Sequence, residues 1–72
     1  MELRKLRESV GVARYALASQ AGVSHFRLFQ AEHGMLELRP DEMQKIDAAL
    51  RSHLAKLLEA AADYQGLPQV SA

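Results

Sequence analysis

The stretch RYALASQAGVSHFRLFQAEH, residues 14–33, decides the fold that this sequence predicts. It is typical of two short helices joined by a tight turn. In the first segment, Leu17, Ala18 and Ala21 fall at i, i+1 and i+4, which places them on one side of a helix. The small side chain of Ala18 allows another helix to cross closely. One apolar side and a close crossing predict a helix packed against a neighbour.

The turn follows at residues 21–24. Gly22 can adopt the positive φ that ends a helix, and Val23 can fill the corner. Ser24 is a good N-cap for the next helix, because its hydroxyl can accept a hydrogen bond from a free backbone N–H. Leu28 and Ala31 then face inward. This pattern predicts a helix-turn-helix, in which the second helix enters a DNA major groove.

The segment resembles the helix-turn-helix of the lambda repressor and Cro-like family, also called the XRE family. Four further stretches resemble that family outside the motif: Leu3–Arg7, Gly11-Val12, Glu32-His33-Gly34, and Leu38–Glu42 followed by Ile46 and Leu50. The resemblance covers residues 3–50. It implies an all-α, lambda-repressor-like bundle that binds double-stranded DNA.

The resemblance also implies which residues meet DNA, and each residue type has a chemical use there. Arg27 can pair with guanine and Gln30 with adenine, while Phe26 can contact a thymine methyl group. His25, at the start of the helix, can donate to a phosphate or a base. Arg14 matches a family position that usually holds a phosphate-binding glutamine. The predicted DNA contacts are Arg14, Ser24, His25, Phe26, Arg27 and Gln30.

The charge of the chain favours DNA only weakly. The net charge of the 72 residues is zero. Residues 1–39 carry six Lys or Arg against four Asp or Glu, and residues 40–72 carry three against five, so the two parts have net charges of +2 and −2. This asymmetry predicts modest phosphate neutralisation, and therefore weak, salt-sensitive DNA binding by a monomer.

Several kinds of site are not expected from this sequence. It has no cysteine, so neither a disulfide nor a cysteine zinc site can form. Its three histidines lack ligand-like spacing, and its glycines form no phosphate-binding loop. We therefore expect no metal, no cofactor and no enzymatic activity. No apolar run approaches the ~20 residues that span a bilayer, and the N-terminus does not read as a signal peptide, so we expect no membrane partner and a cytoplasmic location.

Three short helices are expected within residues 1–39. The first, at about residues 2–9, should bury Leu3, Leu6 and Val10 and leave Arg4, Lys5 and Arg7 largely outside that stripe. The second begins near residue 14 with a poor cap, because Ala13 stands where the family usually has serine. The third spans about residues 24–33 and ends at Gly34. Glu32 is expected to make a structural ion pair or to cap a backbone group, and Leu38 to reach the core.

A long fourth helix is expected over residues 40–65, followed by a flexible tail at residues 66–72. Proline suits its first turn, and Asp41 and Glu42 suit its positive end. Its apolar positions recur at an average of about 3.5 residues, the period of a packing seam: Met43, Ile46, Leu50, Leu54, Leu57, Ala61 and Tyr64. From Asp41 to Tyr64 the helix would be about 36 Å long.

Three short helices can cover only the first half of a helix this long. We therefore expect a homodimer through Leu50, Leu54, Leu57, Leu58 and Ala61. The alternative is that the helix breaks near Ser52 and folds back on its own core.

Two functions remain open at this point. The first is a small dimeric transcriptional regulator, a repressor of the kind found in phages and mobile elements, with two third helices about 34 Å apart on a palindromic site. The second is a protein-interaction module of the anti-repressor or polymerase-binding type. In that case the surface is apolar and consists of Phe26, Phe29 and the Met35-Leu36 loop.

Overall fold

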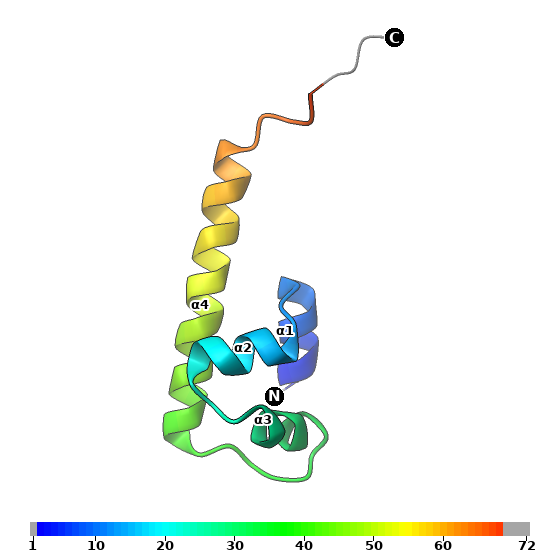
Figure 1. The fold of residues 1–72 in the computed structure, drawn as a ribbon, viewed down its shortest axis with the longest axis vertical. Coiled ribbons are helices and arrows are strands. Elements are labelled where there is room, and N and C mark those ends of the chain that lie inside the picture. The colour runs from blue at the N-terminus through cyan, green and yellow to red at the C-terminus, as the bar shows by residue number, and fades with distance from the viewer. Residues whose placement is uncertain (1, 69–72) are drawn as a thin grey trace.

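The computed structural model describes residues 2–68 and contains four α-helices within them (Figure 1). They are α1 (Leu3–Val10), α2 (Arg14–Ala21), α3 (His25–Glu32) and α4 (Pro40–Asp63). No strand occurs in this part of the chain, which confirms the all-α class. The three short helices gather beside the first half of α4, and the second half projects alone (Figure 1). The principal-axis extents are 55 × 21 × 20 Å.

The turn between α2 and α3 has the predicted local structure. Gly22 has a φ of +71°, and its backbone N–H donates to the carbonyl oxygen of Ser19. Val23 is buried at the corner. The Oγ atom of Ser24 accepts a hydrogen bond from the backbone N–H of Arg27 at 3.3 Å. These contacts end α2, start α3 and determine the angle between them.

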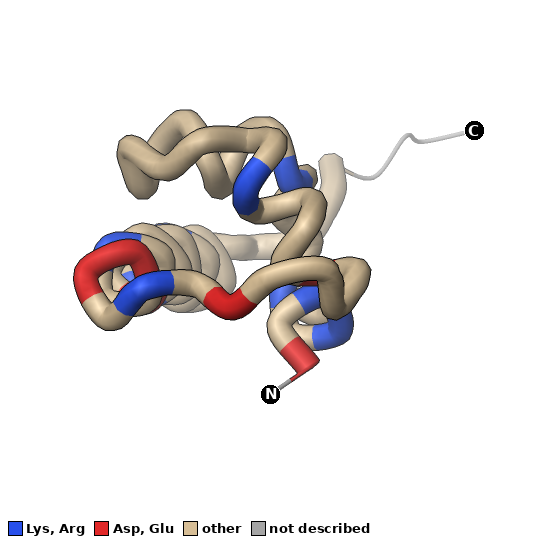
Figure 2. The backbone as a smooth tube through the Cα atoms, turned by 90° about the horizontal axis from the view of Figure 1, so that it is seen from below, with Lys and Arg blue, Asp and Glu red and all other residues tan. Residues whose placement is uncertain are grey.

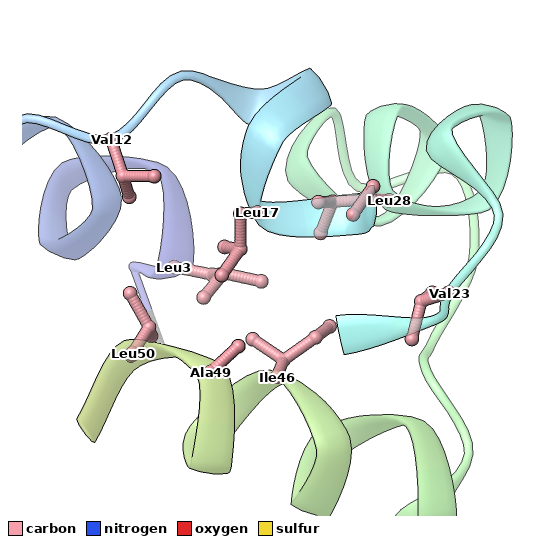
Figure 3. Packing of buried hydrophobic residues seen from close by; sticks show 9 residues of the cluster. Leu3, Val12, Leu17, Val23, Leu28, Ile46, Ala49 and Leu50 are labelled. Carbon is pink, nitrogen blue, oxygen red and sulfur yellow. The ribbon is translucent and has the colours of Figure 1, made fainter. Parts of the chain in front are cut away.

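The core consists of nine buried apolar residues contributed by every helix and by two connections (Figure 3). Leu17, Leu28 and Ile46 are the largest fully buried side chains. They come from α2, α3 and α4, so the helix-turn-helix and the first half of α4 share one core. The other six members are Leu3, Val12, Ala18, Val23, Ala49 and Leu50. Leu38 packs against this core in part, as expected.

The predicted buried face of α1 is wrong in two places. Leu6 is 42% exposed, and Val10 is only half-buried. Arg7, which was expected outside the apolar stripe, is 7% exposed. The physical reason is that its guanidinium has buried partners: it donates to Glu32 on α3 and to the carbonyl oxygen of Val12.

α4 runs through Ser52 without a break, so the helix does not fold back on the core. Its last buried residue is Leu50, one of the expected dimer-interface residues, which also packs in the core of the single chain. Leu54, Leu57 and Leu58 are exposed. The helix ends at Asp63; residues 64–68 are not helical, and the rest of the predicted tail, residues 69–72, lies outside the described residues. Within residues 2–68 no helix combines the length and apolarity needed to cross a membrane.

Candidate nucleic-acid interface

α3 has one side in the core and another side without packing partners. Leu28 is fully buried, whereas His25 is exposed and Phe26 is 65% exposed. Gln30 is half-buried. The ring of His25 lies 5.5 Å from the ring of Tyr15 on α2, measured between centroids. The start of α3 therefore presents the His25 imidazole beside the Tyr15 ring of α2, and an exposed phenyl ring at Phe26.

Arg27 lies on the same helix, but its guanidinium is engaged within the molecule. Its Nε donates to Oε2 of Glu42 at 2.8 Å, and its Nη2 donates to Oε1 of the same carboxylate at 2.7 Å. The side chain of Arg27 is 36% exposed, and that of Glu42 is buried. A two-point contact between a planar guanidinium and a carboxylate is the strong form of this ion pair. It attaches α3 to the first turn of α4.

Glu42 has a third donor. The backbone N–H of Arg39 donates to its Oε1 at 2.9 Å, which is the reciprocal contact of a capping box at the start of α4. The hydrogen bonds from Arg27 and from the Arg39 backbone lower the pKa of Glu42 to about 2. The carboxylate is therefore ionised at neutral pH, and it connects α3, the loop before α4 and the helix α4 itself.

A second carboxylate binds two arginines on the other side of α3. The Oε2 and Oε1 atoms of Glu32 accept from Nε and Nη2 of Arg7 at 2.8 and 3.1 Å. Oε1 also accepts from Nε of Arg14 at 3.0 Å. Burial raises the pKa of Glu32, but the hydrogen bonds from the two arginines outweigh burial, and the net pKa is lowered. The expectation of a structural ion pair at Glu32 is confirmed.

Two of the predicted DNA-binding residues make contacts within the molecule. Arg14 and Arg27 both donate to buried carboxylates, and the guanidinium of Arg14 also lies 5.0 Å from the centroid of the Phe29 ring. Phe29 is half-buried beneath it. The partners are 15 and 18 residues away along the chain, so no local pattern indicates them. The other predicted DNA contacts lie at the cap of α3 or on the helix itself and make no such ion pair within the described residues: Ser24, His25, Phe26 and Gln30.

The charged residues do not collect on one face of the molecule. Figure 2 shows the molecule from the end of α4 where α3 lies, and both Lys or Arg positions and Asp or Glu positions occur at that end. The loop that joins α3 to α4 carries Glu37 as well as Arg39, and Met35 in that loop is 65% exposed. This end of the molecule therefore has a mixed, partly apolar surface.

Metal-ligand clusters are absent from residues 2–68: no three His, Cys, Asp or Glu side chains lie close enough together to hold an ion. His33 instead lies against Phe29, with its Nδ1 atom 2.8 Å from the carbonyl oxygen of that residue. No protein-family model, no curated protein and no solved structure matches the chain.

Proposed function

We propose that this protein binds double-stranded DNA through α3 and regulates transcription by occupying its site. The observation that carries the proposal is the arrangement of α2 and α3. A glycine turn and a serine cap hold the two helices at a defined angle, Leu17 and Leu28 join them inside the core, and the start of α3 has no packing on its other side. A helix supported in this way can enter a major groove.

The chemistry of α3 supports direct contact with bases. Gln30 can form two hydrogen bonds with adenine, and the exposed ring of Phe26 can contact a thymine methyl group. His25 lies at the N-terminus of α3, where backbone N–H groups attract phosphate. Arg27 would have to give up two hydrogen bonds with Glu42 before it could pair with guanine. Gln30 and His25 are therefore the first candidates for reading sequence.

The resemblance to the lambda repressor and Cro-like family supports the same proposal. It adds the expectation that two copies act together on a palindromic site with half-sites about 34 Å apart. Binding by such a pair would block the polymerase, which makes the protein a repressor.

Selection from a random duplex library at low salt tests the proposal. We expect an enriched sequence, and we expect Gln30→Ala to weaken binding to it at least about fivefold, because a two-point contact with a base contributes about 1–3 kcal/mol. Gln20→Ala, which removes an exposed glutamine from α2, is the matched control and should bind normally. Far-UV circular dichroism should show both variants folded. A folded protein that enriches no sequence would contradict DNA recognition.

One observation favours the second function, a protein-interaction module. Phe26 and Met35 are both 65% exposed and are contributed by α3 and by the loop that follows it. Exposed apolar side chains on a surface of mixed charge are typical of contacts with another protein. If the library enriches nothing, a polymerase subunit or a repressor that binds the wild-type chain should lose affinity for the Phe26→Ser and Met35→Ser variants.

A further inference from the structure

A groove lies between α1 and α4. It has a volume of about 580 Å³, and its lining includes Leu3 and Leu6 from α1 and Met43, Leu50 and Leu54 from α4. Most of the surface inside it is apolar, and Leu6 remains 42% exposed there. The groove therefore leaves apolar surface in contact with water although the core beneath it is closed.

The apolar surface continues from the groove along the half of α4 that the other helices do not cover, residues 54–63, called here the free half. Among the large apolar side chains that are exposed in residues 2–68, Leu6 and Leu54 line the groove, and Leu57 and Leu58 lie beyond it on α4. With about 100° of rotation per residue, Leu50, Leu54, Leu57 and Ala61 fall within a sector of about 60°. The groove and this stripe form one continuous apolar strip along α4.

The two parts of the strip have similar lengths. The groove follows α4 from Met43 to Leu54, a distance of about 17 Å, and the free half continues from Leu54 to Asp63 over about 14 Å. The groove is concave, whereas the free half of α4 is a single helix without packing partners. We propose that the free half of α4 from a second copy of this chain fills the groove, and that the two α4 helices run antiparallel with their two-fold axis near Leu54.

The charges on α4 select the antiparallel direction. With the axis at Leu54, Leu50 lies opposite the partner's Leu58, and Asp47 lies opposite the partner's Ala61, so no like charges meet. In a parallel pair Asp47 would face the partner's Asp47, and both grooves would stay empty. The Asp47 side chain pairs with Arg51 on its own helix at 2.8 Å and lies at the rim, where it can remain hydrated.

The pairing has a consequence for the two α3 helices, which Glu42 attaches to α4 through Arg27. Glu42 lies about 18 Å from Leu54 along the helix, so the two Glu42 residues are separated by about 36 Å along α4 in the pair. This length is close to the ~34 Å between successive major grooves. The pairing itself rests on the apolar strip alone and does not require DNA.

Two alanines on α4 provide a test with a matched control. Ala61 lies on the strip, and Ala55 lies about 120° away from it around the helix. In sedimentation equilibrium of the intact chain without DNA, we expect a dimer that Ala61→Asp weakens more than tenfold, because the new carboxylate would lie in an apolar contact opposite Asp47 of the other chain. Ala55→Asp should dimerise like the wild type. A monomer at every concentration up to about 1 mM, or equal effects of the two changes, would overturn the proposal.

Disulfide trapping tests the direction, since the chain contains no cysteine of its own. Asp47→Cys and Ala61→Cys chains are mixed and oxidised. We expect the mixed disulfide to form in excess over both self-linked products. Predominant self-linking of either variant would show a parallel pair and would contradict the antiparallel arrangement. Neither experiment contains DNA. A negative result would therefore contradict the proposed pairing of α4 helices without contradicting the proposal that α3 binds DNA.

Discussion

Arg27 on α3 and Glu42 on α4 form a two-point ion pair, with N–O distances of 2.8 and 2.7 Å. Glu42 also accepts from the backbone N–H of Arg39 at 2.9 Å. One buried carboxylate therefore fixes the position of the proposed DNA-contacting helix relative to the long helix. Any rearrangement of Arg27 toward DNA would begin by breaking this pair.

The coupling between these two residues can be measured directly. We expect Arg27→Met and Glu42→Gln each to lower the Tm by several degrees, because each change leaves a partner of the pair with lost hydrogen bonds. The double variant should lose clearly less than the sum of the two single losses. Thermal melts followed by circular dichroism give the four values. Additive losses would show that the contact does not stabilise the fold.

Acid should weaken the folded state through Glu42. Its pKa in the folded chain is about 2, whereas an unfolded chain has a glutamate pKa of about 4.3. The stabilisation by the ionised carboxylate is therefore complete above about pH 5 and declines as the pH falls from about 5 to 2. Urea unfolding from pH 7 to pH 2.5 should show this decline.

The Glu42→Gln variant isolates the contribution of this residue to the acid response. Glu32 also has a lowered pKa and contributes to the decline in both proteins. The gap in unfolding free energy between wild type and variant should therefore narrow as the pH falls. A gap that stays constant down to pH 2.5 would show that Glu42 titrates normally.

Arg7 should be far more important for stability than its neighbour Arg4. Arg7 is buried between Glu32 and the Val12 carbonyl oxygen, and breaking a buried ion pair from one side costs about 3–5 kcal/mol. We expect Arg7→Met to be largely unfolded in urea-free buffer. Arg4 pairs with Glu8 in solvent, so Arg4→Met should change the free energy of unfolding by less than about 1 kcal/mol. Equal losses in urea titrations would contradict the buried pair.

A better N-cap at the start of α2 should stabilise the protein. Ala13 occupies the N-cap position, with φ −68° and ψ 147°, and its side chain makes no capping hydrogen bond. Ala13→Ser should stabilise the protein by about 1 kcal/mol, because its hydroxyl can accept from a free N–H in the first turn. The Tm should then rise by about 4–8 °C. As a comparison, Ser24→Ala removes the existing cap of α3 and should lower the Tm by a similar amount. If Ala13→Ser leaves the Tm unchanged, the stability of α2 does not depend on a side-chain cap at residue 13.

Local patterns predicted most of the secondary structure. Gly22 and Gly34 both have positive φ where helices were expected to end, and Ser24 caps α3. The spacing of Leu17, Leu28 and Ile46 indicated the core, and the uninterrupted sequence after Pro40 indicated the long helix. These features depend on residues a few positions apart, and propensity, capping and apolar periodicity act over that range.

Arg7 and Arg27 could not be assigned correctly from local sequence patterns. Arg7 was expected at the surface because helical periodicity treats a charged side chain as outward-facing. Arg27 was expected to be available to DNA because the family resemblance implies that contact. Both instead pair with carboxylates that come from other helices. Their long side chains reach partners that only the packing of α1, α3 and α4 brings near, and sequence distance gives no sign of this.

The sequence by itself determined four helices, the Ser24 cap of α3 and most of the apolar positions that hold the helices together, since these follow from interactions between near neighbours in the chain. The tertiary structure decided which charged side chains are buried and which face of α1 is covered. It buried Arg7, Glu32 and Glu42 in ion pairs across helices and left Leu6 partly in solvent. Burial depends on what the other helices cover, and the first half of α4 is all that three short helices can cover.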